Sequence, residues 1–170
     1  MEIRPAVRGD EEGVVRVIRS VFDEYGFTWE PEGYHADLYD LEAHYGGDSA
    51  GFWVLESSGV IHGTVALHFF PPSDLAFDGV LDRLPGCDCD LERLYLSADS
   101  RGRGWGDALF LRSISEARAR GCQQMEIWSD KRFSQAHKLY QKHGARLMRD
   151  RVLHTDPDKS EEWGLVLPLG

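Results

Sequence analysis

The sequence predicts a single α/β domain, of the α+β kind, over residues 1–170, with about seven strands and about four helices. Strand-like runs rich in Val, Leu, Ile and Phe alternate with helical patterns that end at glycines. One stretch has the order strand, loop, helix, strand, which is typical of a parallel crossover. A chain of 170 residues with 42% hydrophobic residues can bury one substantial core and is too short for two.

The first half of the chain is predicted to contain three strands and two helices. Val14, Ile18 and Phe22 repeat at helical spacing, Asp10 is the expected N-cap, and Gly26 is the expected stop. A turn at Ser57-Ser58-Gly59 separates two strand-like runs and predicts a hairpin. The expected elements are a strand over residues 2–7, helices over 11–25 and 37–44, and strands over 52–56 and 60–70.

The second half is predicted to supply the crossover and two closing strands. A strand ends at Leu96, a glycine-rich loop follows, and the next helix ends at Gly121. Further on we expect a strand over residues 124–128, a helix over 134–143 and strands over 145–153 and 163–169. The segment from Pro72 to Cys89 is long for a hairpin, so a short helix or packed loop is expected there.

Composition excludes several classes of partner. A net charge of −10 argues against nucleic acid and against an anionic membrane, since both require a basic face. No secretory segment follows Met1 and no apolar run approaches eighteen residues, so a cytoplasmic protein is expected. The three cysteines lack CxxC spacing, and we interpret them as reduced thiols with no metal, although Cys87-x-Cys89 near a histidine remains an alternative.

The most informative stretch is the loop between the strand ending at Leu96 and the next helix. Glycines at 102, 104 and 106 allow the backbone to approach a ligand, and Arg101 and Arg103 add charge. A helix N-terminus behind such a loop favours an anion, so we interpret the loop as a phosphate site rather than a solvated turn. The spacing fits neither a P-loop nor a dinucleotide fingerprint.

The pattern Arg-x-x-Gly-x-Gly over residues 101–106 resembles the pyrophosphate loop of the GNAT superfamily of acyl-CoA-dependent N-acyltransferases. A second stretch, AHKLYQKHGA over residues 136–145, is similar to that family's Ala-x-x-Leu-Tyr-x-Lys-x-Gly-Phe signature. The resemblance covers nearly the whole chain. It implies a twisted, mixed and mostly antiparallel sheet of about seven strands, flanked by about four helices and splayed between the fourth and fifth strands.

The resemblance implies acetyl-CoA as the acyl donor, with no metal. The loop would hold the CoA pyrophosphate, main-chain groups of the preceding strand would pair with the pantetheine arm, and the 129–136 region would add contacts. Many members have asparagine where this chain has Phe133, which leaves Ser129 or Ser134 as substitutes. The implied cofactor-binding residues are Leu94, Tyr95, Leu96, Arg101, Gly102, Arg103, Gly104, Trp105, Gly106, Asp107, Ser129, Phe133 and Ala136.

The resemblance also implies how protons move. Tyr140 matches the family tyrosine that protonates the departing thiolate, a task that suits a phenol. Some members use a strand carboxylate eleven residues before the loop, which is Asp90 here. Glu92 lies on the same side of that strand, so Asp90 and Glu92 are the candidate general bases, with solvated strand residues as the alternative.

Two other sets of residues have both a functional and a structural interpretation. Aromatic rings and carboxylates alternate over residues 27–50, and Trp29, Glu30, Glu32 and Tyr34 are the candidate contacts to a cationic amine. A capping segment whose rings pack on the sheet is slightly favoured. His62 and His68 share one strand face, and either is a proton acceptor or a half-buried, hydrogen-bonded histidine; the second is favoured.

The sequence therefore predicts an N-acetyltransferase that transfers acetyl directly from acetyl-CoA to a primary amine, on a small molecule or a peptide, in a ternary complex. No cysteine lies in either motif, so an acyl-enzyme has no support. The alternative is a non-catalytic acyl-CoA-binding regulatory module with the same fold. A dinucleotide-binding oxidoreductase is disfavoured by the glycine spacing. Either a monomer or a homodimer is compatible with the sequence.

Overall fold

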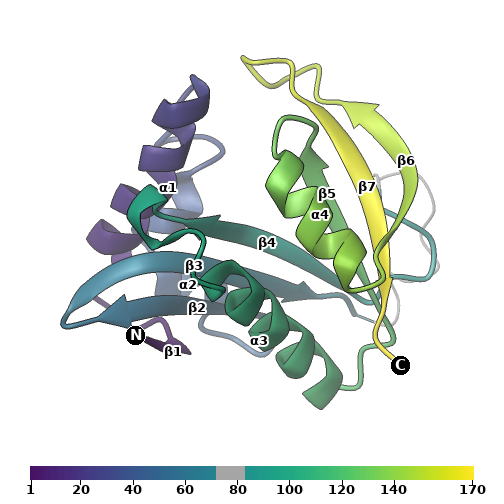
Figure 1. Ribbon diagram of the computed structural model, residues 1–170, viewed down its shortest axis with the longest axis horizontal. Helices are drawn as coiled ribbons and strands as arrows, with labels where there is room; N and C mark the ends of the chain where they lie inside the picture. The colour runs from purple at the N-terminus through teal and green to yellow at the C-terminus, as the bar shows by residue number, and fades with distance from the viewer. Residues whose placement is uncertain (72–82) are drawn as a thin grey trace. The chain divides into compact units, whose positions relative to one another are not determined.

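The computed structural model describes residues 1–71 and 83–170, so most of the segment expected to form a short helix or packed loop lies outside the described residues. Figure 1 shows the arrangement of strands and helices. The strands are β1 (Glu2–Pro5), β2 (Ala50–Ser57), β3 (Val60–Phe69), β4 (Cys89–Leu96), β5 (Gln124–Asp130), β6 (Arg146–Val152) and β7 (Glu161–Pro168). The helices are α1 (Glu11–Tyr25), α2 (Leu41–Tyr45), α3 (Trp105–Ala119) and α4 (Ser134–Lys142), with 3-10 turns η1 (Ala36–Tyr39) and η3 (Ala98–Ser100).

The strands form one seven-stranded mixed sheet in the order β1-β2-β3-β4-β5-β7-β6. β1 runs antiparallel to β2, and β7 runs antiparallel to both β5 and β6. β4 and β5 are parallel, with Cys89, Asp90 and Leu91 opposite Met125, Glu126 and Ile127. The predicted α+β class and crossover are confirmed, because β4, α3 and β5 follow one another and the two strands pair in parallel.

The described residues group into two compact units. The first contains residues 1–67 and 93–113, and the second contains residues 68–92 and 114–170. In the first unit α1 buries one face, formed by Val14, Val17, Ile18, Val21 and Phe22. It ends as predicted at Gly26, whose φ of 72° suits a residue without a Cβ.

Asp10 is the N-cap residue of α1, as predicted, and its carbonyl accepts the backbone N–H of Val14 at 2.9 Å. Its side chain, however, makes no capping hydrogen bond to the helix. Its carboxylate instead accepts hydrogen bonds from Arg4 at 2.7 Å and from the backbone N–H of Val7 at 2.8 Å. A charged partner and a local backbone donor therefore replace the helix N–H as ligands of this carboxylate.

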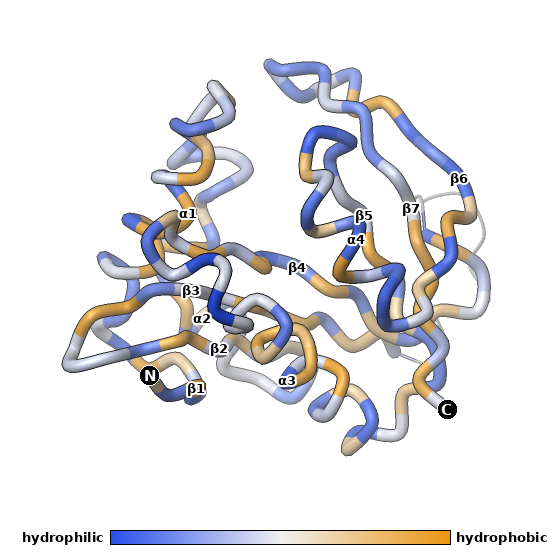
Figure 2. The backbone as a smooth tube through the Cα atoms, in the orientation of Figure 1, coloured by the Kyte–Doolittle hydropathy of each residue, from blue (hydrophilic) through white to orange (hydrophobic). Residues whose placement is uncertain are grey.

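In the second unit, β5 is packed against β7, and a glycine makes room for a large ring. A Cβ atom on Gly164 would lie 2.7 Å from the ring of Trp128, which stands opposite it on β5. Arg151 on β6 lies over the same ring, 3.9 Å from its centroid. Figure 2 shows β7 passing from polar in its first half to apolar in its second, where Leu165 and Leu167 are buried.

Among the helices of residues 1–71 and 83–170, none has the length and apolar character needed to cross a bilayer.

Candidate functional site

The glycine loop links η3 to α3 and exposes its backbone. Residues 101–104 are exposed, and Gly102 and Gly104 have φ values of 73° and 82°, in the left-handed region that disfavours other residues. A Cβ atom at Gly102, Gly104 or Gly106 would meet no atom within 4 Å. The space above the first turn of α3 is therefore open, where backbone N–H groups without intrahelical partners point outward. This arrangement suits an anion.

Arg101 is held against α1. Its Nη1 and Nη2 atoms donate to the two carboxylate oxygens of Glu24 at 2.8 and 2.7 Å, and its Nε donates to the carbonyl of Leu96 at 3.1 Å. The hydrogen bond from Arg101 lowers the pKa of Glu24. The guanidinium thus fixes the start of the loop to α1, and the exposed Arg103 is the other basic side chain of the predicted anion site.

β4 departs from regular strand geometry just before the residues predicted to contact pantetheine. Arg93 has a φ of 54°, which is uncommon for a residue with a Cβ. Its carbonyl accepts a hydrogen bond of 2.6 Å from Thr64 Oγ1. Such a residue interrupts strand alternation, and it lies between Leu91, which pairs with β5, and Leu94, where the predicted pantetheine contacts begin. Strain of this kind persists where the surroundings impose it.

The Arg93 side chain supplies that constraint. Its guanidinium donates to both oxygens of Asp37, at 3.1 and 2.8 Å, and to the carbonyl of Tyr34 at 2.7 Å. It also lies over the Tyr34 ring, 4.3 Å from the centroid. Tyr45 donates a short hydrogen bond to Asp37. The α1–α2 connection is therefore tied to β4 through one buried arginine.

The four candidate acceptor contacts occupy this connection. Trp29 stacks on His35 at a centroid distance of 3.8 Å, and the backbone N–H of Glu30 donates to His35 Nδ1. Glu32 is exposed, and Tyr34 is 55% exposed with one face covered by Arg93. The favoured interpretation of packed rings fits this geometry, and acceptor binding by these four residues stays a prediction.

His35 is a fully buried histidine that sequence analysis did not single out. Its exposed fraction is 0%, and the ring packs edge-on against Phe22 at 4.4 Å. Burial, with the nearby charge of Arg93, lowers the pKa of His35 to about 4. The ring is therefore neutral at physiological pH and acts as an aromatic packing element of this segment.

In the second unit, α4 presents Tyr140 to the interior. Tyr140 is 4% exposed and lies one turn after Ala136 on the same face of the helix. Burial raises the pKa of its phenol. The phenol therefore keeps its proton at neutral pH, as a proton donor to a thiolate must.

The residues around the start of α4 bear on the predicted pantetheine contacts. Phe133 occupies the N-cap position and makes no side-chain capping hydrogen bond. Ser129 Oγ lies 3.0 Å from Nε2 of His137, a buried ring that stacks on Trp163. The Ser129 hydroxyl already has a protein partner, whereas Ser134 is exposed in the first turn of α4.

Carboxyl groups gather on one face of β4 and β5. Asp90 and Glu92 share that face of β4, and Glu126 stands opposite Asp90 on β5. Burial, followed by the charges of Glu92 and Glu126, raises the pKa of Asp90 well above its usual range. Burial also raises the pKa of Glu126, whose carboxylate accepts the N–H of Leu84 at 2.7 Å. The two candidate bases thus belong to one cluster.

His68 of β3 joins this cluster. Its Nδ1 lies 3.0 Å from Oε2 of Glu92, and each side chain is 37% exposed. His68 is thus partly buried and hydrogen-bonded, as the favoured interpretation expects, and a role as proton acceptor stays a prediction. The pairing links two strands at positions 24 residues apart, and no local spacing in the sequence indicates it.

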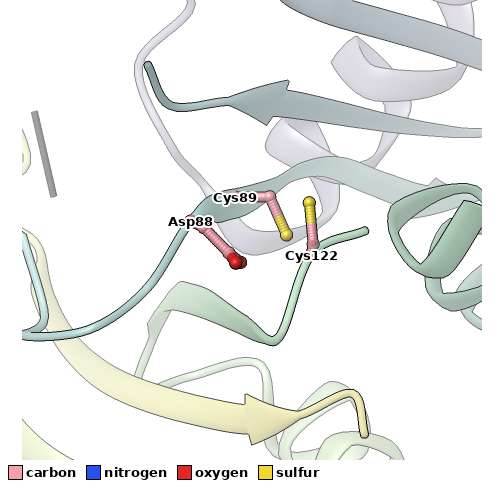
Figure 3. A group of neighbouring side chains, drawn as sticks. All are labelled: Asp88, Cys89 and Cys122. Carbon is pink, nitrogen blue, oxygen red and sulfur yellow. The ribbon is translucent and has the colours of Figure 1, made fainter. Parts of the chain in front are cut away.

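The cysteines are not disulfide-bonded. Figure 3 shows the sulfurs of Cys89 and Cys122 facing each other beside Asp88, and the potential ligand atoms of the three lie within 4.8 Å of one another. The Asp88 carboxylate, however, accepts backbone hydrogen bonds from Gln123 and Gln124, and burial raises the pKa of both thiols. These contacts account for the cluster as a link between the start of β4 and the α3–β5 turn.

A surface groove of about 680 Å³ lies at the other end of α1 from the glycine loop. It is lined by Arg8, Gly9, Glu11, Tyr39, Asp40, Glu42 and Ala43. The loop contacts α1 at Glu24, thirteen residues after Glu11, and a helix rises about 1.5 Å per residue. The groove is therefore separate from the candidate phosphate site.

Comparison with known proteins relates this geometry to a family. The family model described as the acetyltransferase (GNAT) family matches residues 15–145, a range that contains both the glycine loop and Tyr140. The chain belongs to the GNAT acetyltransferase family. Escherichia coli K12 has a protein named uncharacterized N-acetyltransferase YjgM that is 27% identical over 138 residues, covering 78% of this chain and 74% of that protein.

Solved structures of GNAT proteins have the same fold. A GNAT-family acetyltransferase of Staphylococcus aureus Mu50 superposes with a TM-score of 0.79 at 17% identity, covering 99% of each chain. YncA of Salmonella typhimurium, whose structure contains its cofactor acetyl-CoA, superposes with a TM-score of 0.71 at 19% identity, covering all of this chain and 94% of that one. The predicted fold family is confirmed.

Proposed function

We propose that this GNAT protein is an N-acetyltransferase that uses acetyl-CoA and transfers the acetyl group directly to a primary amine. The observation that carries the proposal is the glycine loop, whose two left-handed glycines and open space precede the N-terminus of α3. A pyrophosphate is the kind of group that such backbone N–H donors hold. The YncA structure with acetyl-CoA supports the choice of donor.

In this proposal the side chains divide the proton transfers between them. The amine attacks the thioester carbonyl, a C–N bond forms, and the C–S bond breaks with its electron pair on sulfur. Tyr140 gives a proton to that sulfur, and a base in the cluster around Asp90 and Glu92 takes the proton from the amine nitrogen. Main-chain groups of Leu94 to Leu96 hold the pantetheine arm, and residues 129–136 add contacts to it.

The first test is acyl transfer by the purified protein from acetyl-CoA to a broad panel of amines. The panel contains amino acids, polyamines, aminoglycosides and peptides with unmodified N-termini, and products are read by mass spectrometry. We expect stoichiometric release of CoA with at least one acetylated amine. Acetyl-CoA binding without transfer to any member would favour the alternative, a non-catalytic acyl-CoA-binding module.

The acceptor and the setting of the reaction belong to the proposal as well. A cationic amine, on a small molecule or a peptide, suits the acidic character of the chain and of the β4 cluster. Charge reversal at Glu30 and Glu32 tests the role of the α1–α2 connection, with loss of acceptor affinity as the expected result. Cytoplasmic location, and a monomer or a homodimer, remain predictions of the sequence.

A further inference from the structure

The contact between His68 and Glu92 has the geometry of an oriented histidine. The 3.0 Å separation between His68 Nδ1 and Glu92 Oε2 is a hydrogen-bond distance. An ionised carboxylate only accepts hydrogen bonds, so a neutral His68 must carry its proton on Nδ1. Its lone pair is then on Nε2, which is the atom able to take up a further proton.

The neighbouring Asp90 decides which of the two carboxyl groups, that of Asp90 or that of Glu92, is ionised. Asp90 is the more deeply buried of the two and shares a side-chain hydrogen bond with Glu92. Two carboxylates that face each other and share a hydrogen bond cannot both ionise without a large electrostatic cost. The buried Asp90 therefore keeps its proton, and the half-exposed Glu92 accepts hydrogen bonds from Asp90 on one side and His68 on the other.

The other charged side chains around Asp90 and Glu92 do not change which of the two carboxyl groups carries the proton. In the described part of the second unit, Glu126 of β5 and Arg151 of β6 act on Asp90 with opposite signs, Glu126 favouring its protonated form and Arg151 its charged form. Arg151 also pairs with Glu162 at 2.7 Å. The surroundings therefore favour a proton on Asp90 and a negative charge on Glu92, the carboxylate that faces His68.

We infer that His68 is the group that accepts the proton of the acceptor amine, and that Glu92 acts as a positioning residue that fixes its tautomer and stabilises its charged form. This inference rests on the proposed function and identifies the base of that same site. It also assigns the two carboxyls predicted as bases to supporting positions.

The proton balance of the reaction then closes. One proton leaves the amine nitrogen for His68 Nε2 as the C–N bond forms, and one leaves the Tyr140 hydroxyl for the CoA sulfur as the C–S bond breaks. His68 returns its proton to solvent and Tyr140 recovers one from solvent. The net change is one amine and one acetyl thioester converted into one amide and one thiol.

The hydrogen bond between His68 and Glu92 can be tested without an amine substrate. Long-range ¹H–¹⁵N correlation spectra of ¹⁵N-histidine-labelled protein report the tautomer of each ring, and His68→Asn identifies the His68 signals. We expect protonated Nδ1 in the wild type and in Glu92→Gln, which keeps an acceptor oxygen, and a mixture of tautomers in Glu92→Met. Protonated Nε2 in the wild-type protein would overturn the inference.

The catalytic role is tested with the most active amine of the acceptor panel. His68→Asn should lower kcat/KM by about 100-fold or more, the usual contribution of a general base, and should flatten the acidic limb of the pH profile. Acetyl-CoA affinity should stay within twofold. His62→Asn is the matched control, since His62 lies on the same face of β3, and it should leave the profile unchanged. Wild-type kcat/KM in His68→Asn would overturn the inference.

The two tests separate the possible failures. If no amine is acetylated, the proposed function fails whatever the spectra show. If acetylation occurs and His68→Asn is fully active at every pH, the proposed function stands and the inference about His68 fails.

Discussion

The glycine loop, residues 101–106, and the β4 cluster, formed by His68, Asp90, Glu92 and Glu126, differ in the kind of charge that each is proposed to bind or transfer. In the proposed function the loop accepts a large negative charge, and it offers exposed backbone N–H groups, with the nearby Arg101 already paired with Glu24. The β4 cluster is proposed to transfer single protons, and it contains partly buried side chains whose proton affinities depend on one another. Backbone dipoles are fixed by the fold, whereas proton-transfer groups have to be tuned by burial and neighbours.

This difference decides which substitutions should act on binding and which on turnover. Changes in the loop should lower acetyl-CoA affinity, because they remove space or donors that a ligand uses. Changes at Tyr140 and in the β4 cluster should lower the rate and leave that affinity intact. A substitution that lowers acetyl-CoA affinity and the reaction rate equally would argue against this division between binding and turnover.

The largest effect is expected for Gly104→Val. The φ of 82° strains any residue with a branched Cβ, and the added methyl groups enter the space proposed for the pyrophosphate. We expect acetyl-CoA affinity to fall at least about 1000-fold, or about 4 kcal/mol, by calorimetric titration. Gly121→Val is the matched control, since Gly121 also has a φ of 82° and open space around it but lies at the other end of α3. Equal loss of affinity in both variants would contradict the loop assignment.

Tyr140→Phe should lower the rate of acyl transfer and leave acetyl-CoA affinity unchanged. The phenyl ring keeps the packing of this buried side chain while the proton donor is lost. We expect kcat to fall about 100-fold, as for loss of a general acid, with an unchanged dissociation constant for acetyl-CoA. Single-turnover kinetics with the best acceptor would measure this step, and an unchanged rate would remove Tyr140 from the mechanism.

The α1–α2 connection, residues 26–40, should make the free energy of unfolding depend on pH. The pKa of His35 is about 4 when folded against about 6.5 for an ordinary histidine, so the unfolded chain binds the proton more tightly. This contribution to stability is present above pH 6.5 and is lost as the pH falls toward 4. Between pH 7 and pH 5 we expect a loss of about 2 kcal/mol from this group.

Urea unfolding at the two pH values checks the prediction by comparing the wild type with His35→Gln. The variant should lose less stability than the wild type on acidification. His154→Gln, at an exposed histidine, is the control and should behave as the wild type. Identical pH dependence in His35→Gln would mean that His35 is not a buried neutral ring.

The smallest effect is expected for Arg101→Gln. The ion pair with Glu24 is over a third exposed on each side, and exposed pairs contribute about 0–1 kcal/mol. We expect a decrease in unfolding free energy within that range and an acetyl-CoA affinity within about threefold of the wild type, since the guanidinium is engaged by α1. A tenfold or greater loss of affinity, with Glu24→Gln unaffected, would show that Arg101 is a phosphate ligand after all.

Local patterns made most of the fold predictable. Gly26 and Gly121 marked helix ends correctly because a left-handed C-cap is a requirement of the backbone at that one position. The glycine loop could be predicted as a phosphate site for the same reason, since all of its groups lie within a few residues of one another, and that role stays a prediction. Asp10 was placed correctly at the N-cap, but its side chain does not cap the helix, because Arg4, outside the local pattern, forms a charged hydrogen bond with the same carboxylate.

Long-range pairings account for what could not be predicted. The buried link between Arg93 and Asp37 joins residues 56 positions apart, and the link between His68 and Glu92 depends on how β3 and β4 align. No periodicity in a single sequence encodes such a partner. The roles of Asp90 and Glu92 were left open for that reason, since the ionisation of each depends on groups contributed by other strands.

The most direct test of the account is a calorimetric titration of the wild-type protein with acetyl-CoA, with NAD as the control ligand. We expect saturable binding of one acetyl-CoA per chain and no binding of NAD, because the glycine spacing of the loop does not match a dinucleotide fingerprint. A folded sample that binds neither ligand, or that binds NAD equally well, would contradict it.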